Sequence, residues 1–409
     1  MIYFIVIFLL VYLIFRYDIN GDNKNRDFWL RCVVFIFISI AGFRFRIGGD
    51  TINYLEFYYH ETPNLWEISY EDLFASEIEP LCLLLFSVIY SLGGKFFIVQ
   101  LLQAIIVNVL LCFFFKKHTQ YVFSCFFIYF MWMYIYYDFE ELRAGISVVL
   151  CLLGNDYLQE KKWMNGYMMY VIAIFFHYSS IFFLLTPLIL LLRFNLIGIA
   201  MIFISIPASA LIVHALGDYL LLFGGDDQIS AKALGYVNND EHVRSAGLLY
   251  YLIDVGVPVF YILVSYWYLC IKKMNKTLQQ FQPFVILAIL LYFMSAQLDV
   301  VSRYIHFYAP YLIIFYSTMF IELIKEKAEL TKALVITRSF LFFLPLFSFF
   351  LITLKSVPPR MINNSYRNYQ KYYPYSSIFE QSIIEKREKL YDNLYNINTR
   401  HVLINMDEY

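Results

Sequence analysis

Two residues in the middle of the chain, Arg143 and His177, could together act on a phosphate-linked substrate. An arginine side chain stays charged and presents a planar set of donors that matches phosphate oxygens. A histidine side chain, with an ordinary pKa of about 6.5, can take a proton from a hydroxyl group near neutral pH. The stretch from Asp138 to Ser180 carries both residues on two apolar segments joined by a basic turn at Lys161. A hairpin of these segments through a membrane would return Arg143 and His177 to the same face.

Each of these residues also has a purely structural explanation. Arg143 follows Glu140 and Glu141 and could form an ion pair with them at the membrane surface. His177 could cap a broken helix or hydrogen-bond to the two serines that follow Tyr178. The residues by themselves leave both explanations open.

Composition places the chain among membrane proteins. Hydrophobic residues make up 61% of the sequence, aromatic residues 21% and charged residues 15%, whereas soluble domains have roughly 45–50% apolar and about 25% charged residues. Apolar segments recur along nearly the whole length, which indicates many spans rather than one anchor. These segments do not alternate as the strands of a membrane barrel would, so we expect helices.

The orientation of the spans follows from lysine and arginine in short loops, since these residues are enriched on the cytoplasmic side. A first span over about Ile2–Phe15 precedes a basic loop, which places the N-terminus outside. A second span over about Phe28–Phe43 leads to an outer loop, residues 44–79. Residues 47–79 hold eight acidic side chains, and no Lys or Arg follows Arg46 until Lys95.

Two apolar segments must deviate from a simple crossing if the basic loops are to stay on one side. Pro80–Gly93 spans 14 residues, about 21 Å as a helix, whereas a crossing needs about 20 residues. We therefore expect this segment to be re-entrant. Tyr167–Leu192 is expected to form two short helices broken near His177–Ser180, because a single span would place the later lysine-rich loops outside. The break would lie on the outer side.

The same reasoning predicts an all-α polytopic membrane protein with about 12 transmembrane helices and one re-entrant segment. Residues 1–354 are expected to form a single transmembrane domain, with outer loops at 44–79 and 217–247. Asp299–Arg303 is expected to lie outside, before a span over about Tyr304–Ile324 enters. Residues 355–409 form a tail rich in Tyr and Arg. The number of predicted crossings before it places this tail outside.

The outer face would thus collect most of the polar residues that could bind a substrate. Besides Arg143 and His177, these are Arg46, Asp50, Tyr54, Glu79, Glu141, Asp299 and Arg303. Structural explanations exist here too, since an arginine can extend its head to the lipid headgroups and Glu-Pro is a common helix start.

Other kinds of site have no support in the sequence. Six cysteines stand singly in apolar segments, which indicates packing rather than disulfides or a metal site. No Walker loop, GxSxG, HExxH or glycine-rich nucleotide fingerprint occurs. We expect no cofactor, no metal and no nucleic-acid partner, and a substrate that is lipid-borne or extracytoplasmic.

A series of short motifs resembles the EpsG-like branch of Wzy-type polysaccharide polymerases. In chain order these motifs are Arg46-Ile-Gly-Gly-Asp50-Thr-Ile-Asn-Tyr54, Glu79-Pro80, Leu142-Arg143-Ala144-Gly145 and Phe176-His177-Tyr178-Ser179-Ser180. The motif resemblance covers roughly residues 40–190. The rest of the chain resembles the family only in its hydropathy and in the residues Asp299 and Arg303. Ala144-Gly145 stands where Gln-Ala is usual and Ser180 where Ala is usual, whereas the arginine and the histidine are kept.

The resemblance implies a membrane glycosyltransferase of the GT-C type in the bacterial cytoplasmic membrane, with an outward-facing active site. Such an enzyme joins undecaprenyl-pyrophosphate-linked oligosaccharide repeat units into O-antigen, capsule or exopolysaccharide. It inverts the anomeric centre and needs no metal if arginines supply the charge. The implied partners are the lipid-linked glycan donor and acceptor, the lipid bilayer and a chain-length regulator protein.

The resemblance also implies roles for individual residues. The general base would be His177 or Asp50. The pyrophosphate would be bound by Arg143, Arg303 and Arg46. Contacts to the rest of the substrate are expected from Tyr54, Glu79, Glu141 and Asp299.

Three other functions are consistent with the sequence. A flippase for the same lipid-linked unit would place charges deep inside its spans and would repeat its halves, whereas the charges here gather on one face. An O-antigen ligase would share the lipid-pyrophosphate donor and use a different acceptor, and a membrane acyltransferase is a further enzymatic alternative. The sugars and their linkage are not encoded in any recognisable motif.

Overall fold

The computed structural model describes residues 2–193, a few positions between 195 and 204, and residues 276–295, 299–325 and 368–395. Every regular element in these ranges is a helix, and Arg44 and Ser377 form an isolated β-bridge. The predicted all-α class is therefore confirmed for this part of the chain. The chain divides into two compact units, Met1–Leu184 together with Phe320–Tyr409, and Leu185–Met319.

Three helical segments in the described ranges are long and apolar enough to cross a membrane. They are Ile2–Ile19, Phe96–His118 and Tyr304–Glu322, of 18, 23 and 19 residues. At 1.5 Å per residue they measure about 27 to 35 Å, close to the roughly 30 Å of a bilayer core. Apolar sequence of this length folds as a helix because a helix satisfies its own backbone hydrogen bonds in lipid.

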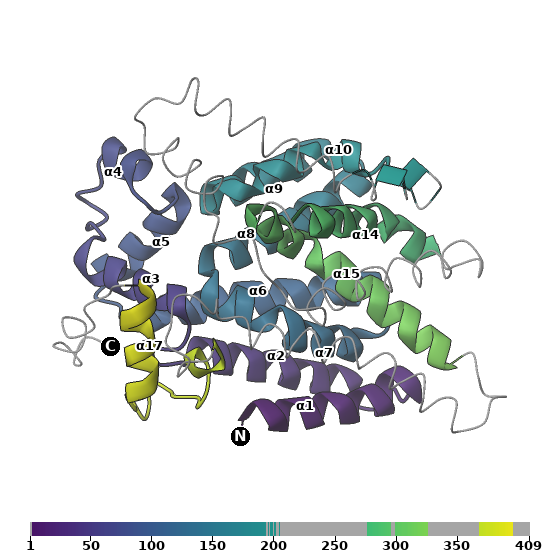
Figure 1. The fold of residues 1–409 in the computed structure, drawn as a ribbon, viewed down its shortest axis with the longest axis horizontal. Helices are drawn as coiled ribbons and strands as arrows, with labels where there is room; N and C mark the ends of the chain where they lie inside the picture. The colour runs from purple at the N-terminus through teal and green to yellow at the C-terminus, as the bar shows by residue number, and fades with distance from the viewer. Residues whose placement is uncertain are drawn as a thin grey trace. The chain divides into compact units, whose positions relative to one another are not determined.

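The main helices of the first unit lie side by side in one stack (Figure 1). They are α1 (Ile2–Leu13), which continues as the π-helix η1 (Ile14–Ile19), α2 (Arg26–Gly42), α6 (Phe96–His118), α7 (Val122–Trp132), α8 (Leu142–Gln159) and α9 (Trp163–Phe176). Helix α6 packs against both α2 and α8, and α8 packs most extensively against α9. The predicted hairpin of two apolar helices is therefore present as α8 and α9.

Glycines allow α8 and α9 to approach closely. A Cβ on Gly154 would lie 2.6 Å from the ring of Tyr170, and a Cβ on Gly166 would lie 2.6 Å from the side chain of Leu158. Small residues at such a crossing let two helices pack tightly, which matters in lipid because burial of apolar surface provides little driving force there. A larger residue at either glycine would force the two helices apart.

The helix breaks at His177, as the charge pattern predicts. Helix α9 ends at the preceding residue, and His177 has an extended backbone with φ −160° and ψ 114° before the 3-10 helix η3 (Tyr178–Leu185). The hydroxyl of Ser147 on α8 hydrogen-bonds to the last turn of α9 at 3.0 Å and also to Ser180 beyond the break. Ser147 thereby holds both sides of the break against α8.

Shorter helices gather at one end of this stack (Figure 1). They are α3 (Gly49–His60), α4 (Tyr70–Ala75), α5 (Pro80–Ser91) and α17 (Glu385–Tyr395). Helix α5 has 12 residues, about 18 Å, which is too short to cross a bilayer. Its length agrees with the re-entrant segment predicted over Pro80–Gly93. Aromatic rings of Tyr58, Phe86 and Phe96 pack edge-on or tilted and join α3, α5 and α6.

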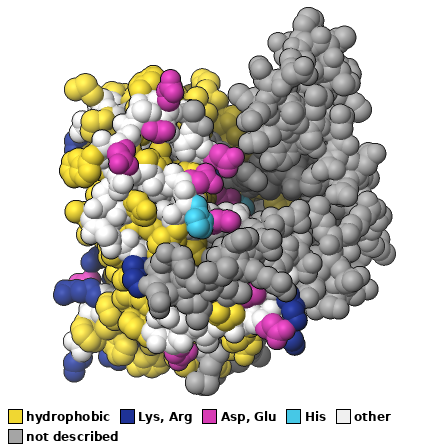
Figure 2. All heavy atoms as spheres, turned by 90° about the vertical axis from the view of Figure 1, so that its left-hand side faces the viewer, with side chains coloured by type: hydrophobic (Ala, Val, Ile, Leu, Met, Phe, Trp, Pro, Cys, Tyr) yellow, Lys and Arg dark blue, Asp and Glu magenta, His cyan; other side chains and the backbone are white. Residues whose placement is uncertain are grey.

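The surface at this end carries many charged side chains. Figure 2 shows acidic side chains in magenta over the upper part of this face and both acidic and basic side chains toward its lower edge. The acidic segment 47–79 includes α3, α4 and the N-cap residue of α5, and it brings eight carboxylates to this end of the stack.

In the second unit, α10 (Thr186–Ile189) packs against α14 (Lys276–Ser295). Helix α15 (Asp299–Lys325) begins in this unit. Helix α15 begins at Asp299, before the predicted start of the span at Tyr304, and the outer location of Asp299–Arg303 stays a prediction. Residues 299–303 contain neither Gly nor Pro, and an acidic residue is favourable in the first turn of a helix, so nothing interrupts the helix before Tyr304.

Several predicted parts lie outside the described residues. They are the loop 217–247, the spans Leu248–Ile271 and Leu334–Leu354, and most of Leu196–Leu216. The boundary at residue 354 between a transmembrane domain and a tail also stays a prediction, since residues 326–367 are not described.

Candidate functional site

Four side chains converge where α8 begins and α9 ends, with Glu79 at the centre. Oε2 of Glu79 accepts a hydrogen bond from Arg143, and Oε1 lies 2.9 Å from Nδ1 of His177. Arg143 also donates from Nε to the hydroxyl of Tyr54 at 3.0 Å, and its Cζ lies 5.2 Å from the centre of that ring. We refer to Tyr54, Glu79, Arg143 and His177 as the Glu79 cluster. The expected meeting of Arg143 and His177 thus occurs through a shared carboxylate.

The local sequence explains how the members of this cluster are placed. Glu79 is the N-cap residue of α5, and Pro80 follows in the first turn, where its missing N–H leaves no hydrogen bond unmade. Arg143 is the second residue of α8, and His177 is the C-cap residue of α9. Three separate helix ends therefore meet, and Tyr54 joins them from α3.

Glu79 is a charged group at neutral pH, although its side chain is only 6% exposed. Burial raises the pKa of Glu79, but the hydrogen bond with His177 and the charge of Arg143 outweigh this effect, so the pKa lies below its ordinary value of 4.5. A carboxylate accepts hydrogen bonds and cannot donate them, so Nδ1 of His177 carries a proton. A neutral imidazole then keeps its lone pair on Nε2. Glu79 thereby determines which nitrogen of His177 can act as a base.

The lowered pKa of Glu79 predicts that the cluster stabilises the fold only above acidic pH. The pKa of Glu79 is lower in the folded protein than in the unfolded chain, where it is near 4.5. The carboxylate therefore stabilises the fold fully at a pH above the unfolded pKa. This stabilisation is lost as the pH falls through the folded pKa. We expect Glu79→Gln to lower the Tm of the purified protein at about pH 7, and the difference from the wild type to narrow below about pH 4.5. Glu77→Gln, two residues earlier and exposed, is the control. A Tm difference that is independent of pH would contradict the ionised arrangement.

Asp50 and Glu141 lie close to the Glu79 cluster. Asp50 stands one turn before Tyr54 on α3, and its backbone N–H donates to Oε2 of Glu140 at 2.9 Å. Burial raises the pKa of Tyr54, the charge of Arg143 opposes this rise, and the charges of Glu141 and Asp50 add to it. Six of the nine predicted site residues thus share one neighbourhood: Asp50, Tyr54, Glu79, Glu141, Arg143 and His177.

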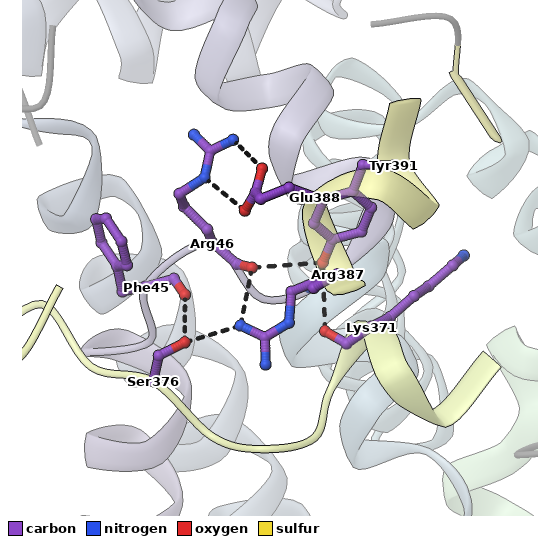
Figure 3. A network of polar contacts seen from close by, with 8 residues as sticks. Phe45, Arg46, Lys371, Ser376, Arg387, Glu388 and Tyr391 are labelled. Carbon is purple, nitrogen blue, oxygen red and sulfur yellow. Dashed lines mark hydrogen bonds and ion pairs between the residues drawn. The ribbon is translucent and has the colours of Figure 1, made fainter. Parts of the chain in front are cut away.

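Of the other three predicted residues, only Arg46 has a described side chain, and it lies in a different pair. Arg46 forms a bidentate ion pair with Glu388 of α17 at 2.9 and 2.6 Å, and both side chains are buried (Figure 3). Pyrophosphate binding by Arg46 stays a prediction, and it would require the substrate to displace Glu388. The side chains of Asp299 and Arg303 lie outside the described part of the structure, so their roles also stay predictions.

Two features of this region were not apparent from the sequence. Glu79 was expected to contact substrate, whereas its two oxygens bind Arg143 and His177, which favours a positioning role. Helix α17 has the composition of an exposed charged helix, yet Arg387, Glu388 and Tyr391 are buried. The local signal of a packed face is the repeat of Leu390 and Tyr391 by Leu394 and Tyr395 four residues later. Among the described residues, no three His, Cys, Asp or Glu side chains gather in a way that could hold a metal ion.

The long apolar helices and the polar cluster at their ends define a helical membrane protein with a candidate site at one end of its helix stack. The model of the EpsG family matches residues 27–377, most of the chain, and the protein belongs to this family. Membership indicates a function like that of a polysaccharide polymerase, and it confirms the resemblance inferred from the motifs. No curated protein and no solved structure matches the chain.

Proposed function

We propose that the protein is a polysaccharide polymerase that transfers a growing glycan from undecaprenyl pyrophosphate onto a lipid-linked repeat unit. The reaction would occur at the outer face of the bacterial cytoplasmic membrane. The observation that supports this proposal most strongly is that Arg143 and His177 bind the same carboxylate, that of Glu79. The reaction needs a fixed cation and a base within one small volume, and the Glu79 cluster offers both.

The proposed step is a single displacement. A hydroxyl oxygen of the acceptor sugar attacks the anomeric carbon of the donor, and the bond between that carbon and the pyrophosphate oxygen breaks. The hydroxyl proton moves to Nε2 of His177, with Asp50 as the alternative base. The leaving undecaprenyl pyrophosphate keeps the electron pair of the broken bond. Attack from the face opposite the leaving group inverts the anomeric centre.

Arg143 would stabilise the charge that develops on the leaving pyrophosphate. Its guanidinium is held by Glu79 and Tyr54, so it does not have to reorganise when the charge appears. Its side chain is 19% exposed, which leaves part of the group accessible to a substrate. Arg303 and Arg46 are proposed as further pyrophosphate contacts, and Asp50, Glu141 and Asp299 as contacts to the sugars.

The proposed architecture is that of a GT-C-like enzyme with about 12 transmembrane helices and a re-entrant α5. Grooves between the helices would hold the two polyprenyl chains, and the helix ends would hold the sugars and the pyrophosphate. The placement of the Glu79 cluster at helix ends supports this division, because an ionised group is less costly near the membrane surface than at its centre.

The decisive experiment is polymerisation by the purified protein. With lipid-linked repeat unit as the sole substrate, we expect a ladder of products that differ by one repeat unit and an equal release of undecaprenyl pyrophosphate. Movement of the unit across vesicles without lengthening would instead identify a flippase. Transfer only to an added non-polymeric acceptor would identify a ligase. Either result would overturn the proposal.

A further inference from the structure

The C-terminal segment, residues 368–395, is folded onto the loop that joins α2 to α3. The N–H of Phe45 donates to the carbonyl of Ser376 at 2.9 Å, and the N–H of Ile378 donates to the carbonyl of Phe43 at 3.0 Å. These bonds form a short antiparallel pairing. The bond between Phe45 and Ser376 joins positions 331 residues apart in the sequence.

The loop that this segment covers has an unusual backbone. Arg46 has φ 50° and Gly48 has φ 101°. Glycine adopts such angles readily, whereas they are unfavourable for arginine. A Cβ at Gly48 would also lie 2.3 Å from the carbonyl oxygen of Phe139. A strained conformation of this kind persists only where surrounding contacts enforce it.

Buried side chains of α17 supply those contacts (Figure 3). Glu388 binds the guanidinium of Arg46 at 2.9 and 2.6 Å. The hydroxyl of Tyr391 accepts a hydrogen bond from the N–H of Gly48 at 3.1 Å. Arg387 donates to the carbonyl of Arg46 at 3.4 Å. The three α17 residues are at most 6% exposed, so these contacts are shielded from water.

The same segment also reaches the start of α8. Tyr372 donates its hydroxyl to Oε1 of Glu140, while Oε2 of Glu140 accepts from a backbone N–H in the first turn of α3 at 2.9 Å. Gly48 is the N-cap residue of α3, so the loop decides where α3 begins. Helices α3 and α8 carry the two partners of the hydrogen bond between Tyr54 and Arg143. The C-terminal segment therefore touches the starts of both helices.

We propose that Glu388, Arg387 and Tyr391 are positioning residues, which align Tyr54 with Arg143 by fixing the loop at which α3 begins. This inference rests on the proposed polymerase function. A misplaced Arg143 would stabilise the transition state less and would bind the ground state almost as before, so kcat falls while KM changes little. A buried ion pair such as Arg46 with Glu388 is suited to this task, since its main effect is to specify one arrangement.

The test uses variants of the full-length protein with purified lipid-linked repeat unit. Glu388→Gln should reduce kcat by about tenfold to a hundredfold and leave KM within about twofold. Tyr391→Phe keeps the ring and removes the hydroxyl that accepts from the N–H of Gly48, so it should also lower kcat and leave KM within about twofold. Glu385→Gln is the matched control, since Glu385 stands three residues earlier on α17 in an exposed pair with Lys389. It should keep the wild-type rate.

Two results would overturn the positioning role. An unchanged kcat per folded Glu388→Gln molecule would show that the segment only stabilises the fold. A rise in KM with an unchanged kcat in Glu388→Gln would show that Glu388 acts on substrate binding and not on the alignment of Arg143.

Hydrogen exchange tests the same contacts without the reaction. The backbone amides of Gly48 and Asp50 should exchange faster in Glu388→Gln, whereas the amide of Gly94, which is bonded to Ile89, should not change. Unchanged exchange at Gly48 and Asp50 would overturn the inference. A different result would separate the two proposals. If the wild type forms no polymer, and the amides of Glu388→Gln still exchange faster, then the proposed function is overturned and the contacts of α17 are supported.

Discussion

Replacement of Arg143 by alanine is expected to abolish polymer and to leave acceptors that carry one repeat unit, at normal levels of the protein. Arg143 is the cation of the Glu79 cluster, and it would face the charge that develops on the leaving pyrophosphate. Removal of one preorganised group of this kind typically lowers the rate by about 10²–10³-fold. The change is measured as the chain length of the product in a strain without the native copy, and as turnover by the purified variant.

A second variant separates catalysis from folding. Loss of Arg143 leaves the buried carboxylate of Glu79 without its cation, which is destabilising by itself. The variant Arg143→Ala with Glu79→Gln removes both charges, and it is compared with Glu79→Gln alone. Equal rates for these two would show that Arg143 acts only as a partner of Glu79. A further loss of about a hundredfold in the double variant would support direct contact with the substrate.

Two other arginine variants complete the series. Arg143→Lys keeps the charge and loses the planar donors that reach both Tyr54 and Glu79, so partial activity is expected. Arg16→Ala breaks an exposed ion pair with Asp22 and should leave the chain length unchanged.

Replacement of His177 by alanine is expected to lower turnover by about 10²–10⁴-fold, the usual contribution of a general base. Polymer should be lost in cells, and a single repeat unit should remain on the acceptor. Glu79→Gln should also reduce the rate, because an amide can donate to His177 and no longer fixes the proton on Nδ1. The ratio of kcat to KM at several pH values measures both effects.

His118 offers a matched control for His177. Its Nε2 lies 2.8 Å from a carboxylate oxygen of Asp156, a pair like that of His177 with Glu79. Asp156 stands near the other end of α8 from Arg143, about 20 Å away along the helix axis at 1.5 Å per residue. We expect His118→Ala to retain polymerisation.

The choice between the two candidate bases can be made with one comparison. Normal chain length in His177→Ala with loss of polymer in Asp50→Asn would assign the base to Asp50. Normal chain length in both His177→Ala and Arg143→Ala would show that the Glu79 cluster is not the active site.

Much of the fold follows from properties that are local in the sequence. A span needs a certain length of apolar residues, and its direction depends on nearby lysines and arginines. For this reason the first helices, the short α5 and the break at His177 could be predicted. The break was predicted because the later lysine-rich loops stay on the cytoplasmic side only if the segment is broken. The extended backbone of His177 confirms it. Helix α15 begins at Asp299, before the predicted span from Tyr304, because hydropathy marks only the apolar part of a helix.

The candidate site could be predicted in part. Arg143 and His177 were expected to meet because a hairpin of two helices joins their ends, and this geometry depends only on helix length. The role of Glu79 could not be derived in this way. A glutamate before a proline marks a helix start, and nothing in the local pattern indicates which side chains will bind it.

The sequence by itself determined the class of this protein, its family and the two ends of the hairpin that carries Arg143 and His177. The tertiary structure alone decided that Glu79 lies between these residues and that Glu388 binds Arg46. The physical reason is the range of the interactions. Hydropathy and charge bias act over neighbouring residues, whereas an ion pair between Arg46 and Glu388 exists only once the whole chain between them has folded.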